Sequence, residues 1–75
     1  MKYFELYVND KIINAYSIYI EGQFKNNNDI IAFCKDNNLF TEEDDYKYIE
    51  YINEINKETF VSATILSERL KNFSV

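Results

Sequence analysis

The sequence predicts a small α+β domain: a three-stranded antiparallel sheet with two helices on one face, in the order β-β-α-β-α. Residues 2–20 hold two alternating apolar stretches joined by a polar turn, the pattern of a hairpin. Downstream, two stretches with helical spacing, residues 29–36 and 57–72, flank a Tyr- and Ile-rich segment at 46–55 that suits a strand. The 75 residues, 1–75, are expected to form one domain, with the third strand beside the first.

The first predicted strand is residues 2–8, because apolar side chains recur there at every second position. The face expected to enter the core carries Phe4, Leu6 and Val8. The opposite face carries Tyr3, Glu5 and Tyr7. An alternation of this kind is typical of a strand with one face buried.

The second predicted strand, residues 12–20, follows a turn at residues 9–11, where Asn and Asp tolerate left-handed backbone. Its expected inward face consists of Ile12, Tyr16, Ile18 and Ile20. Tyr19 falls on the opposite face, with the tyrosines of the first strand.

The first helix is predicted at residues 29–36, with Asn27 or Asn28 as its N-cap. Asp29 places a negative charge in the first turn, where the helix dipole favours it. The expected inner face carries Ile30, Ile31, Phe33 and Cys34. Two asparagines at residues 37–38 end the helix, since Asn substitutes for Gly at a left-handed cap.

Residues 46–55 also fit a helix, whose apolar face would carry Tyr48, Tyr51, Ile52 and Ile55. Only Asn56 separates this segment from the helix at 57–72, so the two would fuse into one of about thirty residues. Helices in globular proteins average ~11–12 residues. We therefore favour a strand, with Asn56 as the N-cap of a final helix that begins at Lys57.

The composition argues against several classes of function. A net charge of −5 disfavours direct binding to nucleic acid and to an anionic membrane surface. The chain has no His, one Cys and one Gly, so it lacks the residues of a zinc site and of a phosphate-binding loop. We expect no enzymatic activity, no metal and no cofactor. Cys34 is expected to be a small buried apolar residue, and a lone Cys fits the cytoplasm of a bacterial host.

Two surface features are candidates for binding another protein. Four consecutive acids form either a solvated charge run or an anionic patch, extended by Glu50 and Glu54 on one strand face beside Tyr48. Tyrosines occupy the sheet face that the helices are expected to leave uncovered, and Tyr is enriched at protein interfaces. The predicted partner-binding residues are Glu42, Glu43, Asp44, Asp45, Tyr48, Glu50, Glu54, Tyr3, Tyr7 and Tyr19.

The chain resembles, in type, the small acidic phage-borne inhibitors of the anti-CRISPR and anti-restriction kind. The shared features are its size, its single α+β domain, its Asn-, Ile-, Tyr- and Lys-rich composition and the acids just named. The resemblance implies an inhibitor that occupies the basic groove of a larger nucleic-acid-binding host protein, with carboxylates in place of phosphates. The alternative is a homodimeric phage or mobile-element accessory or regulatory protein that pairs through the tyrosines.

Overall fold

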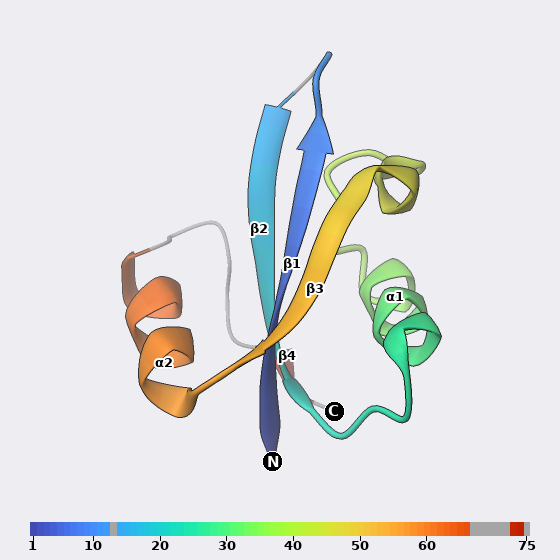
Figure 1. The fold of residues 1–75 in the computed structure, drawn as a ribbon. Coiled ribbons are helices and arrows are strands. Elements are labelled where there is room, and N and C mark those ends of the chain that lie inside the picture. Colours follow the sequence, from blue (N-terminus) through green and yellow to red (C-terminus); the bar gives the residue numbers. More distant parts are fainter. Residues whose placement is uncertain (13, 67–72, 75) are drawn as a thin grey trace.

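The computed structural model describes residues 1–12, 14–66 and 73–74. Its elements in chain order are β1 (Lys2–Asp10), β2 (Asn14–Gly22), α1 (Asn27–Asp36), the 3-10 helix η1 (Asp45–Tyr48), β3 (Ile49–Ile55), α2 (Lys57–Leu66) and β4 (Phe73–Ser74). Figure 1 shows the strands side by side between the two α-helices. The predicted α+β class and the order β-β-α-β-α are confirmed, and η1 and β4 are additions to them.

The strands form a sheet in the order β3-β1-β2-β4. Strand β1 is central and antiparallel to both of its neighbours, as the sequence predicts. The hairpin register places Lys2 opposite Gly22 and Asp10 opposite Asn14. Strand β4 adds a short parallel pairing, with Phe73 opposite Ile20.

The hairpin turn lies one to two residues later than predicted. Asp10 still belongs to β1, and its carboxylate accepts a hydrogen bond of 3.0 Å from the backbone N–H of Ile12. This contact is typical of turns that Asp stabilises. Ile12 therefore belongs to the turn, with 92% of its surface exposed, and the expectation that it joins the inward face is wrong.

The hydrophobic core lies between the sheet and α1. Every second residue of β1 from Phe4 onward is buried, as its alternation predicts. The buried cluster consists of Phe4, Leu6, Val8, Ile18, Ile20, Ile30 and Cys34. Full burial of a Val, Leu or Ile side chain stabilises the fold by about 1.5–3 kcal/mol. Ile30 and Cys34 thus confirm the predicted inner face of α1, at whose margin Ile31 and Phe33 are half-buried.

The N-cap of α1 is Asn26, whereas Asn27 and Asn28 lie inside the first turn. The Asn26 side-chain oxygen accepts a hydrogen bond of 3.0 Å from the backbone N–H of Asp29. Asp29 sits in the first turn, as predicted. Three consecutive asparagines are all competent caps, so only the backbone decides which one is used. Asn26 has the required extended backbone, with φ −159° and ψ 176°.

The C-terminus of α1 is closed by the predicted asparagines. Asn38 adopts the left-handed conformation, with φ 55°. The backbone N–H of Leu39 donates a hydrogen bond of 3.0 Å to the carbonyl of Cys34. The backbone N–H of Asn38 donates one of 3.1 Å to the carbonyl of Lys35. This pair of bonds is a Schellman motif, which satisfies the last carbonyls of the helix.

The fold prediction depends on residues 46–55, and only the second part of this segment is a strand. Residues Ile49–Ile55 form β3, whereas Asp45–Tyr48 form η1, so the helical alternative is wrong and the strand is shorter than predicted. The Asn56 side chain accepts a hydrogen bond of 2.8 Å from the N–H of Thr59. Asn56 is therefore the predicted N-cap of α2, which begins at Lys57.

The two helices lie on opposite sides of the sheet (Figure 1). Phe60 of α2 is 2% exposed, and its ring centroid lies 4.9 Å from that of Tyr3, whose face of β1 is opposite to that of Phe4. The expectation that both helices cover one face is therefore wrong. Tyr3 and its cross-strand partner Ile55 offer apolar surface where β3 ends, which favours this docking of α2. Residues 67–72 of the predicted final helix lie outside the described residues.

We predict that Asn26→Ala lowers the free energy of unfolding by about 1 kcal/mol, because it removes the cap. Asn27→Ala and Asn28→Ala serve as matched controls in the same turn and are expected to change it by less than about 0.5 kcal/mol. Urea unfolding followed by circular dichroism measures all three. A larger loss for Asn27→Ala or Asn28→Ala than for Asn26→Ala would contradict the cap assignment.

Candidate functional site

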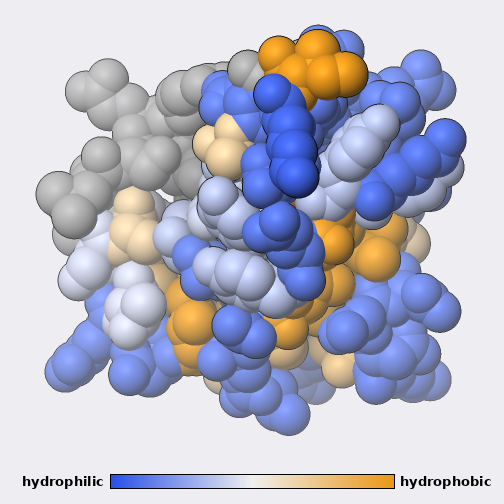
Figure 2. Space-filling view, turned by 45° about the horizontal axis from the view of Figure 1, so that its top comes forward, coloured by the Kyte–Doolittle hydropathy of each residue, from blue (hydrophilic) through white to orange (hydrophobic). Residues whose placement is uncertain are grey.

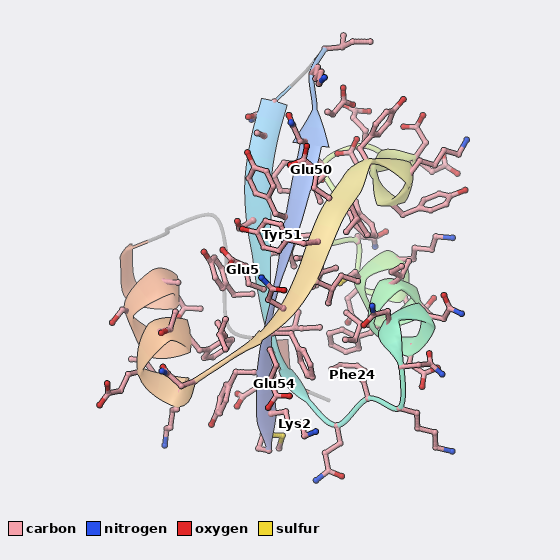
Figure 3. The ribbon with its side chains drawn as sticks, viewed as in Figure 1. Lys2, Glu5, Phe24, Glu50, Tyr51 and Glu54 are labelled. Atoms are coloured by element: carbon pink, nitrogen blue, oxygen red, sulfur yellow. The ribbon has the colours of Figure 1, made fainter. Side chains whose placement is uncertain are left out.

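The part of the sheet that α2 does not contact carries a group of polar and aromatic side chains. The strand register places Tyr7 between Ser17 and Tyr51, and places Glu5 beside Tyr19. We name this group the tyrosine face, and its members are Glu5, Tyr7, Ser17, Tyr19, Glu50 and Tyr51. In Figure 3, Glu5, Tyr51 and Glu50 follow one another along this side of the strands.

Glu5 is the centre of the tyrosine face. Its Oε2 accepts a hydrogen bond of 2.7 Å from the hydroxyl of Tyr19 and one of 3.1 Å from the hydroxyl of Ser17. Both donors come from β2, the strand next to Glu5. Hydrogen bonds to a charged acceptor are stronger than neutral ones. The carboxylate is therefore held in a fixed position while it remains half-buried at the surface.

Tyr7 and Tyr51 form a stacked pair across β1 and β3. Their ring centroids are 5.4 Å apart and their planes differ by 19°. Such a pair contributes about 0.5–1.5 kcal/mol beyond the area it buries. Tyr51 keeps 39% of its surface exposed, so part of the aromatic pair is accessible at the surface.

Two phenols of this face, those of Tyr19 and Tyr51, stay neutral at physiological pH. Burial raises the pKa of Tyr19, and the hydrogen bond to Glu5 raises it further. Partial desolvation and the Glu5 carboxylate raise the pKa of Tyr51 in the same way. A neutral phenol donates a hydrogen bond and adds no charge. The negative charge of the face therefore comes from its carboxylates.

A β-bulge directs Glu50 toward the tyrosine face. The register shifts by one residue, because Tyr7 lies opposite Tyr51 but Val8 lies opposite Ile49, which leaves Glu50 as the extra residue. The Glu50 carboxylate accepts a hydrogen bond of 3.1 Å from the side-chain amide of Asn9. Glu50 thus adds a second carboxylate beside Tyr51 (Figure 3).

The bulge also separates Glu50 from Glu54. Glu54 lies opposite Phe4, on the side of the sheet that holds the core, and its carboxylate is 3.8 Å from the ammonium group of Lys2. The expectation that Glu50 and Glu54 share one strand face is therefore wrong, because one extra residue reverses the alternation. The Lys2–Glu54 pair is more than half exposed and contributes little to stability.

The four consecutive acids do not form one exposed run, because Asp45 is only 1% exposed. Its Oδ2 accepts a hydrogen bond of 2.6 Å from the Tyr16 hydroxyl and one of 3.2 Å from the N–H of Glu42. The Tyr16 hydroxyl oxygen in turn accepts a hydrogen bond of 2.9 Å from the backbone N–H of Thr41. Asp45 therefore fastens the loop that precedes β3 to strand β2, and the expectation that it is an exposed binding residue is wrong.

The structure separates the remaining predicted residues into different places. Glu42, Glu43 and Asp44 are exposed on the loop that Asp45 holds to the core side of β2, away from the tyrosine face. Tyr48 is 41% exposed in η1. Tyr3 packs against Phe60 and is not part of the open surface.

Of the predicted residues, the structure therefore brings together Tyr7, Tyr19 and Glu50. Glu5, Ser17 and Tyr51 complete the group and were not selected from the sequence. The signal for Glu5 was present, because the alternation of β1 places it between Tyr3 and Tyr7 on the same face. Tyr51 could be placed only once the β1–β3 register was known.

The described residues contain no cluster of His, Cys, Asp and Glu that could hold a metal ion. Cys34 is fully buried, which confirms its predicted role as a small core residue. Burial raises the pKa of its thiol to about 12, so it stays protonated and is a poor nucleophile. Across residues 1–12, 14–66 and 73–74, no helix has the length and apolarity that spanning a membrane requires.

We predict that Tyr16→Phe lowers the free energy of unfolding by about 1–3 kcal/mol, because it removes a hydrogen bond to the buried Asp45 carboxylate and the acceptor of the Thr41 N–H. Tyr48→Phe removes the same atom from an exposed ring and is the matched control, with an expected change below about 0.5 kcal/mol. Urea unfolding measures both variants. Equal stabilities for the two would show that Asp45 does not depend on Tyr16.

The folded protein is expected to lose stability at alkaline pH. Burial raises the pKa of Tyr16 and of Tyr19 above the ordinary value of 10.0, so the folded state holds these protons more tightly than the unfolded state. Their contribution is fully present below that value and is lost as the pH rises through the folded-state pKa. Absorbance titration of the phenols, compared with the Tyr16→Phe/Tyr19→Phe double variant, tests this. Ionisation of all tyrosines near their ordinary pKa would contradict it.

Comparison of the chain with models of protein families, with curated protein sequences and with solved structures finds no match.

Proposed function

We propose that this protein is an interaction domain that binds a basic surface of a larger nucleic-acid-binding protein and inhibits it. The observation that carries the proposal is the tyrosine face, where two carboxylates and three phenols lie together on a part of the sheet that the described residues of α2 do not cover. An inhibitor of this kind would be of the anti-CRISPR or anti-restriction type and would act in the cytoplasm of a bacterial host.

The charge distribution supports a basic partner. The chain has a net charge of −5. Within the described residues, Lys35 lies 3.7 Å and Lys47 5.9 Å from the centroid of the Tyr46 ring, and Lys2 pairs with Glu54. None of these cations neutralises the tyrosine face. The carboxylates of this face therefore complement a positively charged protein surface. Attraction between the two surfaces favours fast association, which salt weakens.

The composition and rigidity of the face also support binding to a protein. Tyr offers a large contact area and a hydroxyl at a low cost in conformational entropy. Hydrogen bonds already fix Glu5, and stacking already fixes Tyr7 and Tyr51. Side chains that are ordered before binding lose less entropy when the complex forms. Figure 2 shows one side of the molecule, on which polar residues predominate and apolar residues appear between them.

Inhibition would follow from competition for the nucleic-acid site. Glu5 and Glu50 would stand in for phosphates of the nucleic acid, and the tyrosines would add contacts that a simple polyanion lacks. The exposed acids Glu42, Glu43 and Asp44 lie on another part of the molecule and are not required for this contact.

The test is a DNA-cleavage assay with a panel of purified CRISPR effectors and restriction endonucleases. We expect the wild-type chain to inhibit a member of the panel, and Glu5→Gln/Glu50→Gln to weaken inhibition at least about tenfold. Glu42→Gln/Glu43→Gln removes the same charge elsewhere and is expected to inhibit like the wild type. Raising the salt from about 50 to about 300 mM should weaken inhibition, because salt screens the exposed charges.

Two outcomes would refute the proposal. One is the absence of inhibition across the panel together with a stable dimer in sedimentation experiments, which would favour the homodimeric alternative. The other is inhibition that responds equally to both double variants, because the tyrosine face would then have no special role.

A further inference from the structure

We propose that the tyrosine face binds an arginine side chain of its partner, with the guanidinium group against the Tyr7–Tyr51 pair and hydrogen-bonded to Glu5. The inference rests on the proposed function in one respect, namely that the partner protein supplies the arginine. It adds the chemical group that the face recognises.

The aromatic pair provides the first half of such a site. Tyr7 and Tyr51 are nearly parallel, and Tyr51 is accessible over 39% of its surface. A cation over the face of a Tyr ring gains about 0.5–1 kcal/mol at an exposed position and more when it is desolvated. A guanidinium group is planar and stacks on such a ring, whereas an ammonium group interacts as a hydrated point charge. Lys35, with its ammonium nitrogen 3.7 Å from the centroid of the Tyr46 ring, is an example of the second kind elsewhere in this chain.

The carboxylate provides the second half. Oε2 of Glu5 is held by the Tyr19 and Ser17 hydroxyls, at 2.7 and 3.1 Å. The Tyr51 side chain also hydrogen-bonds to this carboxylate. A carboxylate has about four acceptor positions, so three donors leave one for an N–H group of a guanidinium. Glu50 adds a second carboxylate next to Tyr51. An arginine here would meet an aromatic surface and a fixed acceptor together.

Charge complementarity favours a cation as the occupant. Within the described part of the chain, Lys2 forms an ion pair with Glu54 on the opposite side of the sheet, and Lys35 and Lys47 lie over Tyr46. The Tyr19 and Tyr51 phenols, whose pKa values are raised, are neutral and do not compete as anions. A cation from another protein would therefore pair with Glu5 without displacing a described lysine.

The test is an NMR titration of the full-length chain, with ¹³C-labelled tyrosine rings, against three short capped peptides. The peptides share one sequence and carry Arg, Lys or citrulline at the central position. We expect the Arg peptide to shift the ring signals of Tyr7, Tyr19 and Tyr51 to saturation. The Lys peptide should bind several-fold more weakly, and citrulline, which has a similar shape but no charge, should not bind.

Variants assign the contact. Glu5→Gln keeps the shape of the side chain and should weaken Arg-peptide binding about tenfold, whereas Glu43→Gln should leave it unchanged. Tyr51→Leu should reduce the preference for Arg over Lys, because it removes the stacking surface. The unbound spectra show whether each variant folds, and Tyr51→Leu tests the site independently of Glu5.

Several results would overturn the inference. Equal binding of the Arg and Lys peptides would show that the face attracts any cation and has no site specific for arginine. The same ring shifts caused by Arg69→Gln without peptide would assign the site to the chain's own arginine. Shifts that depend on protein concentration alone would assign it to a second copy.

The inference and the proposed function can fail separately. Saturable Arg-peptide binding without inhibition of any nuclease would retain the arginine site and reject the inhibitor. Glu5-dependent inhibition without selective peptide binding would retain the inhibitor and reject the arginine site.

Discussion

The central position of β1 is the constraint on which the rest of the structure depends. Because β1 is hydrogen-bonded on both edges, its side chains can leave the sheet only at its two faces. Phe4, Leu6 and Val8 enter the core under α1, which stabilises the fold. The alternate residues, among them Glu5 and Tyr7, must then face the other way, where the described part of α2 packs on Tyr3 at one end of the strand. The alternation that builds the core thus also builds the tyrosine face.

Local polar contacts determine how the other elements meet this strand. The Tyr16–Asp45 hydrogen bond fastens the loop before β3, and η1 then leads into an edge strand with a bulge. The bulge keeps Ile49 and Ile52 against the core while Glu50 turns to the opposite face. Glu50 can therefore join Tyr51 on one surface without removing an apolar residue from the core.

The sequence was sufficient where a single local signal decides the structure. Alternation predicted β1, helix-stop asparagines predicted the end of α1, and Asn56 predicted the start of α2. It was insufficient where two distant segments must meet. The bulge depends on the β1–β3 register, and the burial of Asp45 depends on a tyrosine that is 29 positions away. The face on which α2 packs depends in the same way on the contact of Phe60 with Tyr3, which no local pattern specifies.

Binding through the tyrosine face requires this face to be open to solvent in the whole chain. The solvent exposure of each tyrosine ring is measured by the paramagnetic relaxation that a soluble, uncharged gadolinium chelate causes in its NMR signals. We expect strong relaxation for Tyr51 and Tyr48, which are 39% and 41% exposed, and weak relaxation for Tyr16, whose hydroxyl is held by Asp45. If Tyr51 were as protected as Tyr16, the face would be closed and could not bind a partner.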